Sequence, residues 1–363
     1  MAKYRIAWMP GDGVGNDVME ATRIVLDKLA LDAEYVPADI GWEFWRQEGD
    51  PLPKRTLDIL RETDCALFGA ITSKPKDVSQ KELIPELQGK GLVYRSPIVR
   101  LRQTLDLYTC LRPCKAYPGN SLNYKDGIDI TVFRENTQGM YIGVEFAQVP
   151  DAFYQVPGVE KLPRDAAISF RAITASSSER IVRAAFEYAK KHGKTKVTAV
   201  HKANVLRQTD AVFMEAARKV AADYPNIAFD NANIDAMGMW LLKNPFNYQV
   251  IVTTNLFGDI ISDLCAQMVG GLGFGCSGNI GDDLAVFEPT HGSAPKYDRL
   301  YKVNPIATIL AAKMMLDWLG ETDMAAQLES AVAAVIAEGE VRTYDMGGDH
   351  STLEMAEAIA GKL

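Results

Sequence analysis

The stretch NLFGDIISD, residues 255–263, sets two carboxylates, Asp259 and Asp263, four residues apart directly after a β-like run at 248–254. If a helix starts near Phe257, both carboxylates lie on one helical face, where like charges at this spacing repel each other. A bound cation would remove the repulsion, and hard carboxylate oxygens suit Mg²⁺ or Mn²⁺ better than Zn²⁺. The spacing alone is also typical of a solvated acidic pair, so both interpretations stay open here.

Composition places the chain among ordinary globular proteins, with 47% hydrophobic and 24% charged residues. Its 363 residues exceed the usual size of one core, so two lobes are expected. The net charge of −8 disfavours a nucleic-acid partner. The five cysteines lack metal-binding spacing, and neither a long apolar segment nor a cationic leader is visible, so we expect no membrane segment and a cytoplasmic location.

Strand-like runs alternate with helical patterns along most of the chain, which predicts an α/β fold with substantial parallel sheet. The runs lie at 6–9, 66–68, 128–133, 196–200 and 250–253, and the helical patterns at 17–29, 176–191, 209–223 and 305–319. The stretch 144–163 breaks this rhythm, and 166–174 alternates like an exposed strand. We interpret this part as an arm that pairs with another subunit.

The glycine-rich sequence GDGVG at 11–15 follows the first strand and invites a dinucleotide-binding interpretation. Its spacing does not match G-x-G-x-x-G, and the nearest later acidic residue, Asp39, lies too far along the chain for a Rossmann fingerprint. The sequence therefore favours a tight structural turn over direct contact with a phosphate.

Three arginines, Arg102, Arg112 and Arg134, each closely follow apolar residues. Arginine is costly to bury without a partner, and its planar fork fits a carboxylate in a bidentate way. Each of the three is therefore either half of an internal salt bridge or part of a ligand clamp, and one arginine by itself more often forms the salt bridge.

Three further side chains have chemistry suited to a proton-transfer site. Lys202 ends a strand-like run and is expected to open a helix, where a lysine can act as a base. Tyr141 follows a turn at 134–137, and its phenol could deliver a proton to a carbanion. Asp235 is a third carboxylate in an apolar setting, where an unpaired charge is costly. The Gly- and Pro-punctuated loop 287–297 is either a cofactor loop or a long connection.

With these pieces in order, the chain resembles the β-decarboxylating dehydrogenases, the isocitrate, homoisocitrate and 3-isopropylmalate dehydrogenase family. The resemblance runs from 11 to 348 and is most specific in NLFGDIISD (255–263) and GGLGFGCSGNIGD (270–282). It implies an α/β fold with two lobes around a mixed sheet, which is not a Rossmann fold. It also implies a large domain of residues 1–104 and 271–363 with the cofactor loop, and a small domain of residues 105–270 with the dimer interface and an arm at about 142–172.

The same resemblance implies roles for the side chains described above. It places the substrate clamp at Arg102, Arg112 and Arg134, the proton donor at Tyr141, the base at Lys202, and the Mg²⁺ or Mn²⁺ ligands at Asp235, Asp259 and Asp263. It further implies a homodimer with shared active sites, in which Lys202 and Asp235 come from the opposite subunit.

The implied reaction is the oxidative decarboxylation of isocitrate to 2-oxoglutarate and CO₂, a step of the tricarboxylic acid cycle. Ser96 matches the serine by which isocitrate enzymes contact their substrate, whereas Ile98 departs from the usual asparagine two residues later. The alternatives are 3-isopropylmalate or homoisocitrate dehydrogenase, because specificity pockets diverge faster than catalytic ones. A non-catalytic regulatory subunit is disfavoured, since every side chain assigned to catalysis is present.

The expected cofactor is NADP, with NAD as the alternative. Lys296, Tyr297 and Tyr344 match positions that grip the 2′-phosphate in NADP-using relatives, although Gly348 replaces an arginine found in some of them. A cation suits that extra phosphate charge. The remaining cofactor contacts implied by the resemblance are Ile71, Thr72, Glu288, His291, Gly292, Ser293, Ala294 and Asn304.

Overall fold

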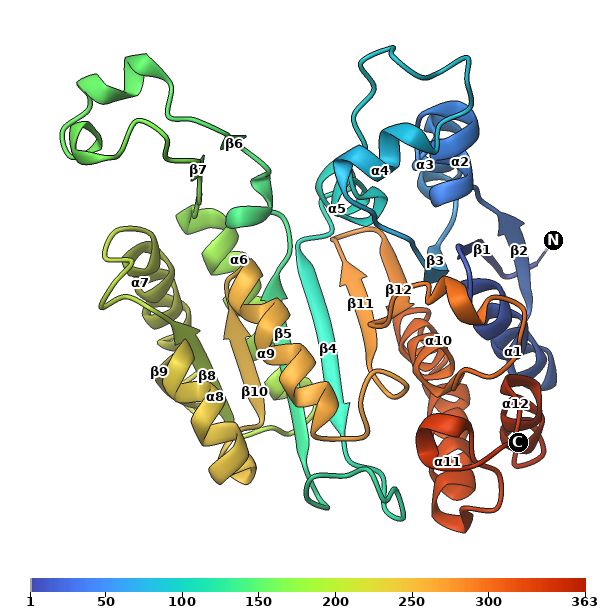
Figure 1. Cartoon of the computed structure of the whole chain (residues 1–363). Coiled ribbons are helices and arrows are strands. Elements are labelled where there is room, and N and C mark those ends of the chain that lie inside the picture. Colours follow the sequence, from blue (N-terminus) through green and yellow to red (C-terminus); the bar gives the residue numbers. More distant parts are fainter. Residues whose placement is uncertain (1) are drawn as a thin grey trace.

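A ten-stranded sheet runs through the computed structural model, which describes residues 2–363 (Figure 1). In sheet order its strands are β2 (Ala33–Pro37), β1 (Tyr4–Gly11), β3 (Cys65–Ala70), β12 (Ala285–Pro289), β11 (Cys276–Ile280), β4 (Thr109–Lys115), β5 (Asp129–Glu135), β10 (Val250–Thr253), β8 (Lys196–His201) and β9 (Ala228–Asn233).

The sheet consists of two parallel blocks joined by antiparallel strands. Strands β2, β1, β3 and β12 are parallel to one another, as are β5, β10, β8 and β9. Between the blocks, β12, β11, β4 and β5 pair in antiparallel fashion. A Rossmann fold has a mostly parallel sheet, so this antiparallel centre confirms the prediction of a mixed sheet in a different fold.

The main helices are α1 (Gly15–Lys28), α2 (Trp42–Glu48), α3 (Lys54–Arg61), α4 (Lys76–Lys81), α5 (Pro97–Thr104), α6 (Ala175–Lys191), α7 (Thr209–Ala221), α8 (Ile234–Lys243), α9 (Asn255–Gln267), α10 (Ile306–Trp318), α11 (Thr322–Glu338) and α12 (Thr352–Ala360). Short 3₁₀ turns add η1 (Met140–Ile142), η2 (Asp151–Gln155), η3 (Val159–Lys161), η4 (Pro245–Asn247), η5 (Pro295–Tyr297) and η6 (Tyr344–Met346).

Helices cover both faces of both blocks, which gives the three layers of an α/β protein (Figure 1). In one block, α1, α10, α11 and α12 pack on one face and α3 and α5 on the other. In the second block, α6 and α7 cover one face, and α8 and α9 cover the opposite one. Each face therefore buries its own apolar cluster, and the antiparallel strands join the two lobes.

The elements expected from periodicity are present, each with bounds within two residues of those expected. The exposed strand expected at 166–174 is wrong in extent, because only β7 (Ile168–Ser169) forms a strand there, paired with β6 (Glu145–Phe146), while Ala172 makes an isolated bridge to Gly139. The rest of this segment is held by η2, η3 and a cluster of three phenylalanine rings, Phe146, Phe153 and Phe170, whose centroids lie 5.7–6.1 Å apart. Figure 1 shows the segment projecting away from the sheet as an arm.

The GDGVG sequence forms the tight turn that its spacing favoured. Gly11 and Gly13 have φ values of 73° and 54°, a region that glycine enters without strain. A side chain on Gly11 would also meet the carbonyl oxygen of Ala70 at 2.0 Å. Asp12 of this turn accepts hydrogen bonds from the backbone N–H groups of Trp42 and Thr72, so the turn holds α2 and the end of β3 together.

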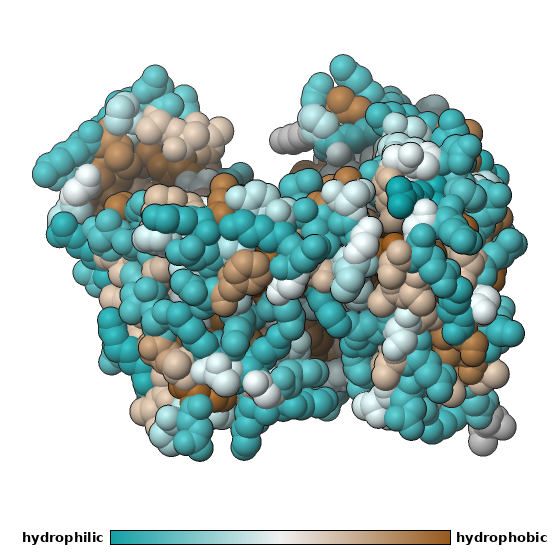
Figure 2. All heavy atoms as spheres, turned by 90° about the horizontal axis from the view of Figure 1, so that it is seen from below, coloured by the Kyte–Doolittle hydropathy of each residue, from teal (hydrophilic) through white to brown (hydrophobic). Residues whose placement is uncertain are grey.

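The face of the molecule seen from below is mostly hydrophilic, with apolar residues in separate patches (Figure 2). Among the helices of residues 2–363, none is both long enough and apolar enough to span a membrane.

Candidate active site

Three buried arginines meet where the antiparallel strands join the two lobes. The β4–β5 register places Cys110 opposite Arg134, so Arg112, two residues along β4, projects from the same face as Arg134. Arg102 comes from α5, and the exposed fractions of the three residues are 6%, 7% and 1% for Arg102, Arg112 and Arg134. Burial and the neighbouring charges of Arg102 and Arg112 lower the pKa of Arg134. This cluster of positive charge requires anionic partners.

The protein supplies part of that negative charge from α9. Arg134 forms an ion pair with Asp259, and Arg112 donates to Asp263 over 3.0 Å and to Ser262 over 2.6 Å. Asn255, at the start of α9, accepts a hydrogen bond from Nε of Arg134 at 2.9 Å. Both interpretations of the arginines are therefore realised in part, because they form internal ion pairs and still lie together as a clamp would require.

Arg112 retains unused hydrogen-bonding capacity. Its Nε atom is shielded from solvent and has no hydrogen-bond partner within residues 2–363. A buried unpaired donor is costly, and a carboxylate that accepts from it would remove the cost. This atom therefore leaves the cluster a free donor that fits a further anion.

The two carboxylates of α9 have different electrostatic environments. Burial alone would raise the pKa of Asp259, but Arg134, the Tyr141 hydroxyl and Arg112 hold that pKa below its usual value. Burial raises the pKa of Asp263, and the charge of Asp259 raises it further. The pair therefore carries the like-charge conflict expected from its spacing, and two hard oxygen donors in this conflict fit a divalent cation.

Tyr141 lies beside these groups. Its hydroxyl donates to Asp259 over 2.6 Å, and the guanidinium carbon of Arg134 lies 4.9 Å from its ring centroid. Burial raises the pKa of Tyr141, and the hydrogen bond to Asp259 acts in the same direction. The phenol therefore keeps its proton at neutral pH, which suits a proton donor.

A small cavity of about 190 Å³ adjoins the arginines. Its polar side chains are Arg102, Arg112, Glu288, Thr290 and His291, and its larger apolar side chains are Phe68, Ile71 and Ile98. Ser96, the residue just before α5, is half-buried and does not line this cavity, whereas Ile98 does. Of the two residues expected to select the substrate, only Ile98 therefore faces the anion-binding cluster.

Glu288, whose expected contact with the cofactor stays a prediction, is bound to Arg102 in the structure. It accepts hydrogen bonds from Arg102 at 3.0 Å and from Asn279 at 2.7 Å. Asn279 in turn accepts from Arg102 Nε at 2.8 Å and from Asn136 at 3.0 Å. This buried network fixes the orientation of Arg102, and sequence reasoning did not identify the two asparagines.

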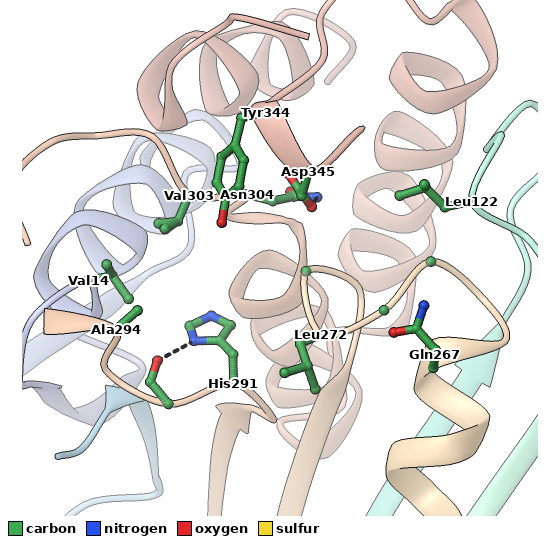
Figure 3. A pocket seen from close by; sticks show the side chains of 14 residues that line it. Val14, Leu122, Gln267, Leu272, His291, Ala294, Val303, Asn304, Tyr344 and Asp345 are labelled. Carbon is green, nitrogen blue, oxygen red and sulfur yellow. Dashed lines mark hydrogen bonds between the residues drawn. The ribbon is translucent and has the colours of Figure 1, made fainter. Parts of the chain in front are cut away.

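A larger cavity of about 500 Å³ lies next to the small one, and the two share His291 and Gly292. Figure 3 shows His291 and Ala294 on one side, Leu272 and Gln267 on another, and Tyr344 above them. The Nδ1 atom of His291 lies 3.0 Å from the Gly292 carbonyl oxygen, while its Nε2 atom is shielded and unpartnered within residues 2–363. An orphaned ring nitrogen in a cavity of this size fits a nucleotide base.

The remaining expected cofactor residues fall into three groups. Ala294, Asn304 and Tyr344 line the large cavity, and Ile71 lines the small one. The hydroxyls of Thr72 and Ser293 lie 2.6 Å apart and join the end of β3 to the cofactor loop. Lys296 and Tyr297 do not line either cavity, but the Tyr297 ring lies 5.6 Å from that of Tyr344, and Lys296 Nζ lies 4.7 Å from the Tyr297 ring.

Sequence reasoning missed much of the wall of the large cavity. The missed residues are Val14, Leu122, Gln267, Gly270, Gly271, Leu272, Gly273, Val303 and Asp345. The glycine-rich run at 270–273 was available as a signal, because close backbone approach to a ligand favours glycine. The others come from distant parts of the chain and carry no local motif.

Lys202 and Asp235 form a separate pair. Lys202 Nζ lies 2.5 Å from Asp235 Oδ1, which lowers the pKa of that carboxyl. Two expectations are wrong here: α7 begins only at Thr209, so Lys202 opens a series of turns and not a helix, and the Asp235 side chain is 66% exposed and not in an apolar setting. Within residues 2–363, no three His, Cys, Asp or Glu side chains of one chain are grouped as a metal site.

The geometry defines a class of protein: a buried arginine cluster for a polyanionic small molecule lies beside two carboxylates suited to a divalent cation and a cavity suited to a nucleotide. Comparisons with known proteins agree. The family described as isocitrate/isopropylmalate dehydrogenase matches residues 5–359.

The chain is 42% identical to 3-isopropylmalate dehydrogenase of Archaeoglobus fulgidus, covering 99% of each chain. It is 40% identical to isocitrate/homoisocitrate dehydrogenase of Thermus thermophilus, covering 99% of this chain and 98% of that one. The crystal structure of isocitrate dehydrogenase from Methylococcus capsulatus is similar, with a TM-score of 0.87, 38% identity and 99% coverage of each chain.

The chain therefore belongs to the isocitrate/isopropylmalate dehydrogenase family. It is an enzyme of the decarboxylating hydroxy-acid dehydrogenase type, and enzymes of this family use NAD(P) and a divalent metal such as Mg²⁺ or Mn²⁺.

Proposed function

We propose that this enzyme oxidatively decarboxylates a 2-hydroxy acid with a carboxylate on the neighbouring carbon and an apolar third substituent, as in 3-isopropylmalate. The observation that carries this choice is the position of Ile98, which lines the 190 Å³ cavity beside Arg102 and Arg112. An apolar wall accommodates an aliphatic group and leaves a third carboxylate without a hydrogen-bond donor. This proposal replaces isocitrate, the first expectation from the sequence, as the leading substrate.

The relatives support the same order of substrates. Proteins named 3-isopropylmalate dehydrogenase from two archaea are each 42% identical to this chain over nearly its whole length. Relatives named isocitrate/homoisocitrate and homoisocitrate dehydrogenase are 40% and 38% identical. Isocitrate and homoisocitrate stay as second candidates because of Ser96, whose hydroxyl could reach a substrate that extends beyond the cavity.

The site residues have distinct proposed tasks. Arg102, Arg112 and Arg134 bind and orient the two substrate carboxylates. Lys202 of the opposite subunit accepts the proton of the C2 hydroxyl, and Tyr141 donates a proton to the carbon that loses its carboxyl group. Asp259, Asp263 and Asp235 of the opposite subunit would hold the cation. The cation and the nicotinamide supply a Lewis acid and a hydride acceptor.

We propose NADP as the preferred dinucleotide. Tyr344 lines the large cavity, Tyr297 packs against Tyr344, and Lys296 lies over the Tyr297 ring, so the group offers one positive charge and two hydroxyls to a 2′-phosphate. Gly348 has no side chain to add to this group. A larger residue would not fit there as the backbone stands, because its Cβ atom would lie 2.2 Å from the carbonyl oxygen of Arg342. Lys296 is therefore the one side chain of this group with a positive charge for the phosphate.

We propose that the chain works as a homodimer. Large apolar side chains are exposed on α8 and α9, among them Met239, Leu242 and Ile260 at 54%, 44% and 56%. The arm adds Phe146 and Phe170 at 37% and 42%. Exposed apolar surface of this kind marks an interaction site, and a second copy would cover it.

Steady-state assays on 3-isopropylmalate, isocitrate, homoisocitrate and D-malate, each with Mg²⁺ or Mn²⁺ and either dinucleotide, test the substrate. We expect kcat/KM for 3-isopropylmalate to exceed the others, and Ile98→Asn to lower this preference by about tenfold. Val93→Asn is the matched control, since Val93 is 58% exposed and outside the cavity. A wild-type preference for isocitrate would overturn the proposal.

A further inference from the structure

A buried ion pair lies between the arm and the loop that carries Lys202. Asp210, in the first turn of α7, is fully buried, and its Oδ1 atom lies 2.7 Å from Nη2 of Arg171. The Arg171 side chain is 13% exposed. A buried charge pair of this kind is rarely a gain for stability compared with apolar packing. Its presence therefore calls for an explanation beyond stability.

The second oxygen of Asp210 fixes the backbone of Lys202. Its Oδ2 atom accepts a hydrogen bond from the Lys202 N–H at 2.6 Å. On the other side of the same residue, the Lys202 carbonyl oxygen accepts from the N–H groups of Val205 and Leu206 at 2.9 and 2.8 Å. Lys202 lies in turns between β8 and α7, where no regular ladder holds it. Asp210 therefore supplies a constraint that secondary structure does not.

Arg171 connects this constraint to two other parts of the site. It donates to the hydroxyl of Thr254 at 3.1 Å, and Thr254 directly precedes α9, the helix of Asp259 and Asp263. It also donates to the Thr209 hydroxyl next to Asp210. Ala172, the next residue along the chain, bridges to Gly139, directly before the turn that contains Tyr141. One guanidinium thus joins the base of the arm, the start of α7 and the start of α9.

We propose that Asp210 and Arg171 are positioning residues. Asp210 holds the Lys202 backbone and thereby sets the direction of the Lys202 side chain, and Arg171 connects Asp210 to the base of the arm. This inference rests on the proposed role of Lys202 as the base. Because Asp210 does not touch the reacting atoms, it acts through Lys202. A lysine displaced by about 1 Å would lose much of its effect, on the order of 10- to 100-fold.

The test is a double-mutant cycle of Asp210→Asn and Lys202→Ala in the full-length enzyme. In asparagine an NH₂ group replaces one carboxylate oxygen and the charge is lost, so the residue cannot both accept from the Lys202 N–H and form the ion pair with Arg171. We expect Asp210→Asn to lower kcat by about 10- to 100-fold with little change in KM. In the Lys202→Ala background, the same substitution should have almost no further effect.

A second variant distinguishes the loss of positioning from a loss of folding. Arg171→Lys keeps the charge but cannot contact Asp210, Thr209 and Thr254 together, so kcat should fall while circular dichroism and dimer content stay unchanged. Asp223→Asn is the matched control, because it breaks an exposed Arg183–Asp223 pair at the other end of α7. Its kcat should equal that of the wild type.

The outcomes separate the two proposals. If Lys202→Ala lowers kcat but the effects of Asp210→Asn and Lys202→Ala multiply, Asp210 does not act through Lys202 and the positioning proposal is overturned. If Arg171→Lys folds normally and retains full kcat, the part assigned to Arg171 is likewise overturned. If Lys202→Ala retains wild-type activity, the proposed function of Lys202 fails, and the inference that rests on it fails for that separate reason.

Discussion

At the scale of single residues, the site contains buried side-chain nitrogen atoms that lack hydrogen-bond partners. Nε of Arg112 and Nε2 of His291 are both shielded from solvent and unpartnered within residues 2–363. Unpaired buried donors and acceptors are rare because each costs free energy on the order of 1–3 kcal/mol. One of these atoms lies in the anion-binding cluster and the other at the cavity suited to a nucleotide. Both atoms are free to bind ligand atoms in the sites proposed above.

Replacement of Tyr141 by phenylalanine removes the proposed proton donor and leaves the ring against Arg134. We expect the final protonation to slow by about 100-fold or more, while hydride transfer changes much less. The measurement is the overall rate together with the fraction of 2-oxo acid intermediate released before protonation. Tyr154→Phe is the control, because Tyr154 lies in the arm and its hydroxyl binds the Pro163 carbonyl oxygen. An unchanged rate and unchanged partitioning would remove this role from Tyr141.

Replacement of Lys296 by aspartate puts a negative charge where the 2′-phosphate of NADP is proposed to bind. The ratio of kcat/KM for NADP to that for NAD should fall by at least about tenfold, because attraction becomes repulsion. Lys302→Asp makes the same change of net charge at an exposed position outside the cavity and should leave the ratio unchanged. Equal ratios in wild type and Lys296→Asp would contradict the NADP assignment.

At the scale of elements, α9 has a buried apolar face and also carries the two carboxylates of the site. Its inner face buries Ile261, Cys265 and Ala266, while Asp259 and Asp263 project toward the arginines. The arginines neutralise Asp259 well but Asp263 poorly, since its side chain is still 58% exposed. The incompletely neutralised Asp263 therefore fits a further cation beside it.

Asp263→Asn tests this arrangement through stability as well as activity. The folded-state pKa of Asp263 is raised by burial and by Asp259, so its ionisation destabilises the metal-free fold at pH values above that pKa. At neutral pH the asparagine variant should have a higher Tm without metal, and the gain should disappear below the unfolded-state pKa of about 3.9. The rise in Tm on addition of Mn²⁺ should be smaller than in the wild type.

Calorimetric scans with and without Mn²⁺ measure these effects, and Asp283→Asn is the control because Asp283 is an exposed carboxylate away from α9. If Mn²⁺ raises the Tm of Asp263→Asn as much as that of the wild type, Asp263 is not a ligand of the cation.

At the scale of the whole molecule, the two parallel blocks meet in antiparallel strands, and the arginine cluster lies at this junction. Lys202, which follows β8, pairs with Asp235 of α8, and the two form no group with Asp259 and Asp263 in the described chain. In the homodimer proposed above, the second copy would bring its Lys202 and Asp235 to Asp259 and Asp263. The domain boundaries at 104/105 and 270/271 stay predictions.

Shared active sites predict complementation between inactive variants. Lys202→Ala and Tyr141→Phe dimers, mixed and allowed to exchange subunits, should regain activity because each mixed dimer contains one intact site. At equal amounts and random exchange, about one quarter of the wild-type activity is expected. A mixture of two Lys202→Ala preparations is the control. Activity no higher than the average of the two variants would indicate sites built from a single chain.

The sequence predicted the strands β1, β3, β5, β8 and β10 because their periodicity is local, but it did not single out β4 or the edge strands β2 and β9. Helices such as α6 and strands such as β10 lie within two residues of their expected bounds. The central strands β11 and β12 were not among the runs singled out, although they join the two lobes. Their residues include glycine, serine, asparagine and proline, and pairing with neighbours, more than intrinsic propensity, makes them strands.

The sequence by itself determined the family, the parallel blocks and the identity of the charged side chains, because motifs and periodicity are properties of neighbouring residues. Only the tertiary structure showed that Ile98 faces the cavity while Ser96 does not, that Glu288 binds Arg102, and that Asp235 is exposed. It also joined Asp210 to Lys202 and Arg171. These facts depend on contacts between segments distant in the chain, which local sequence patterns do not encode.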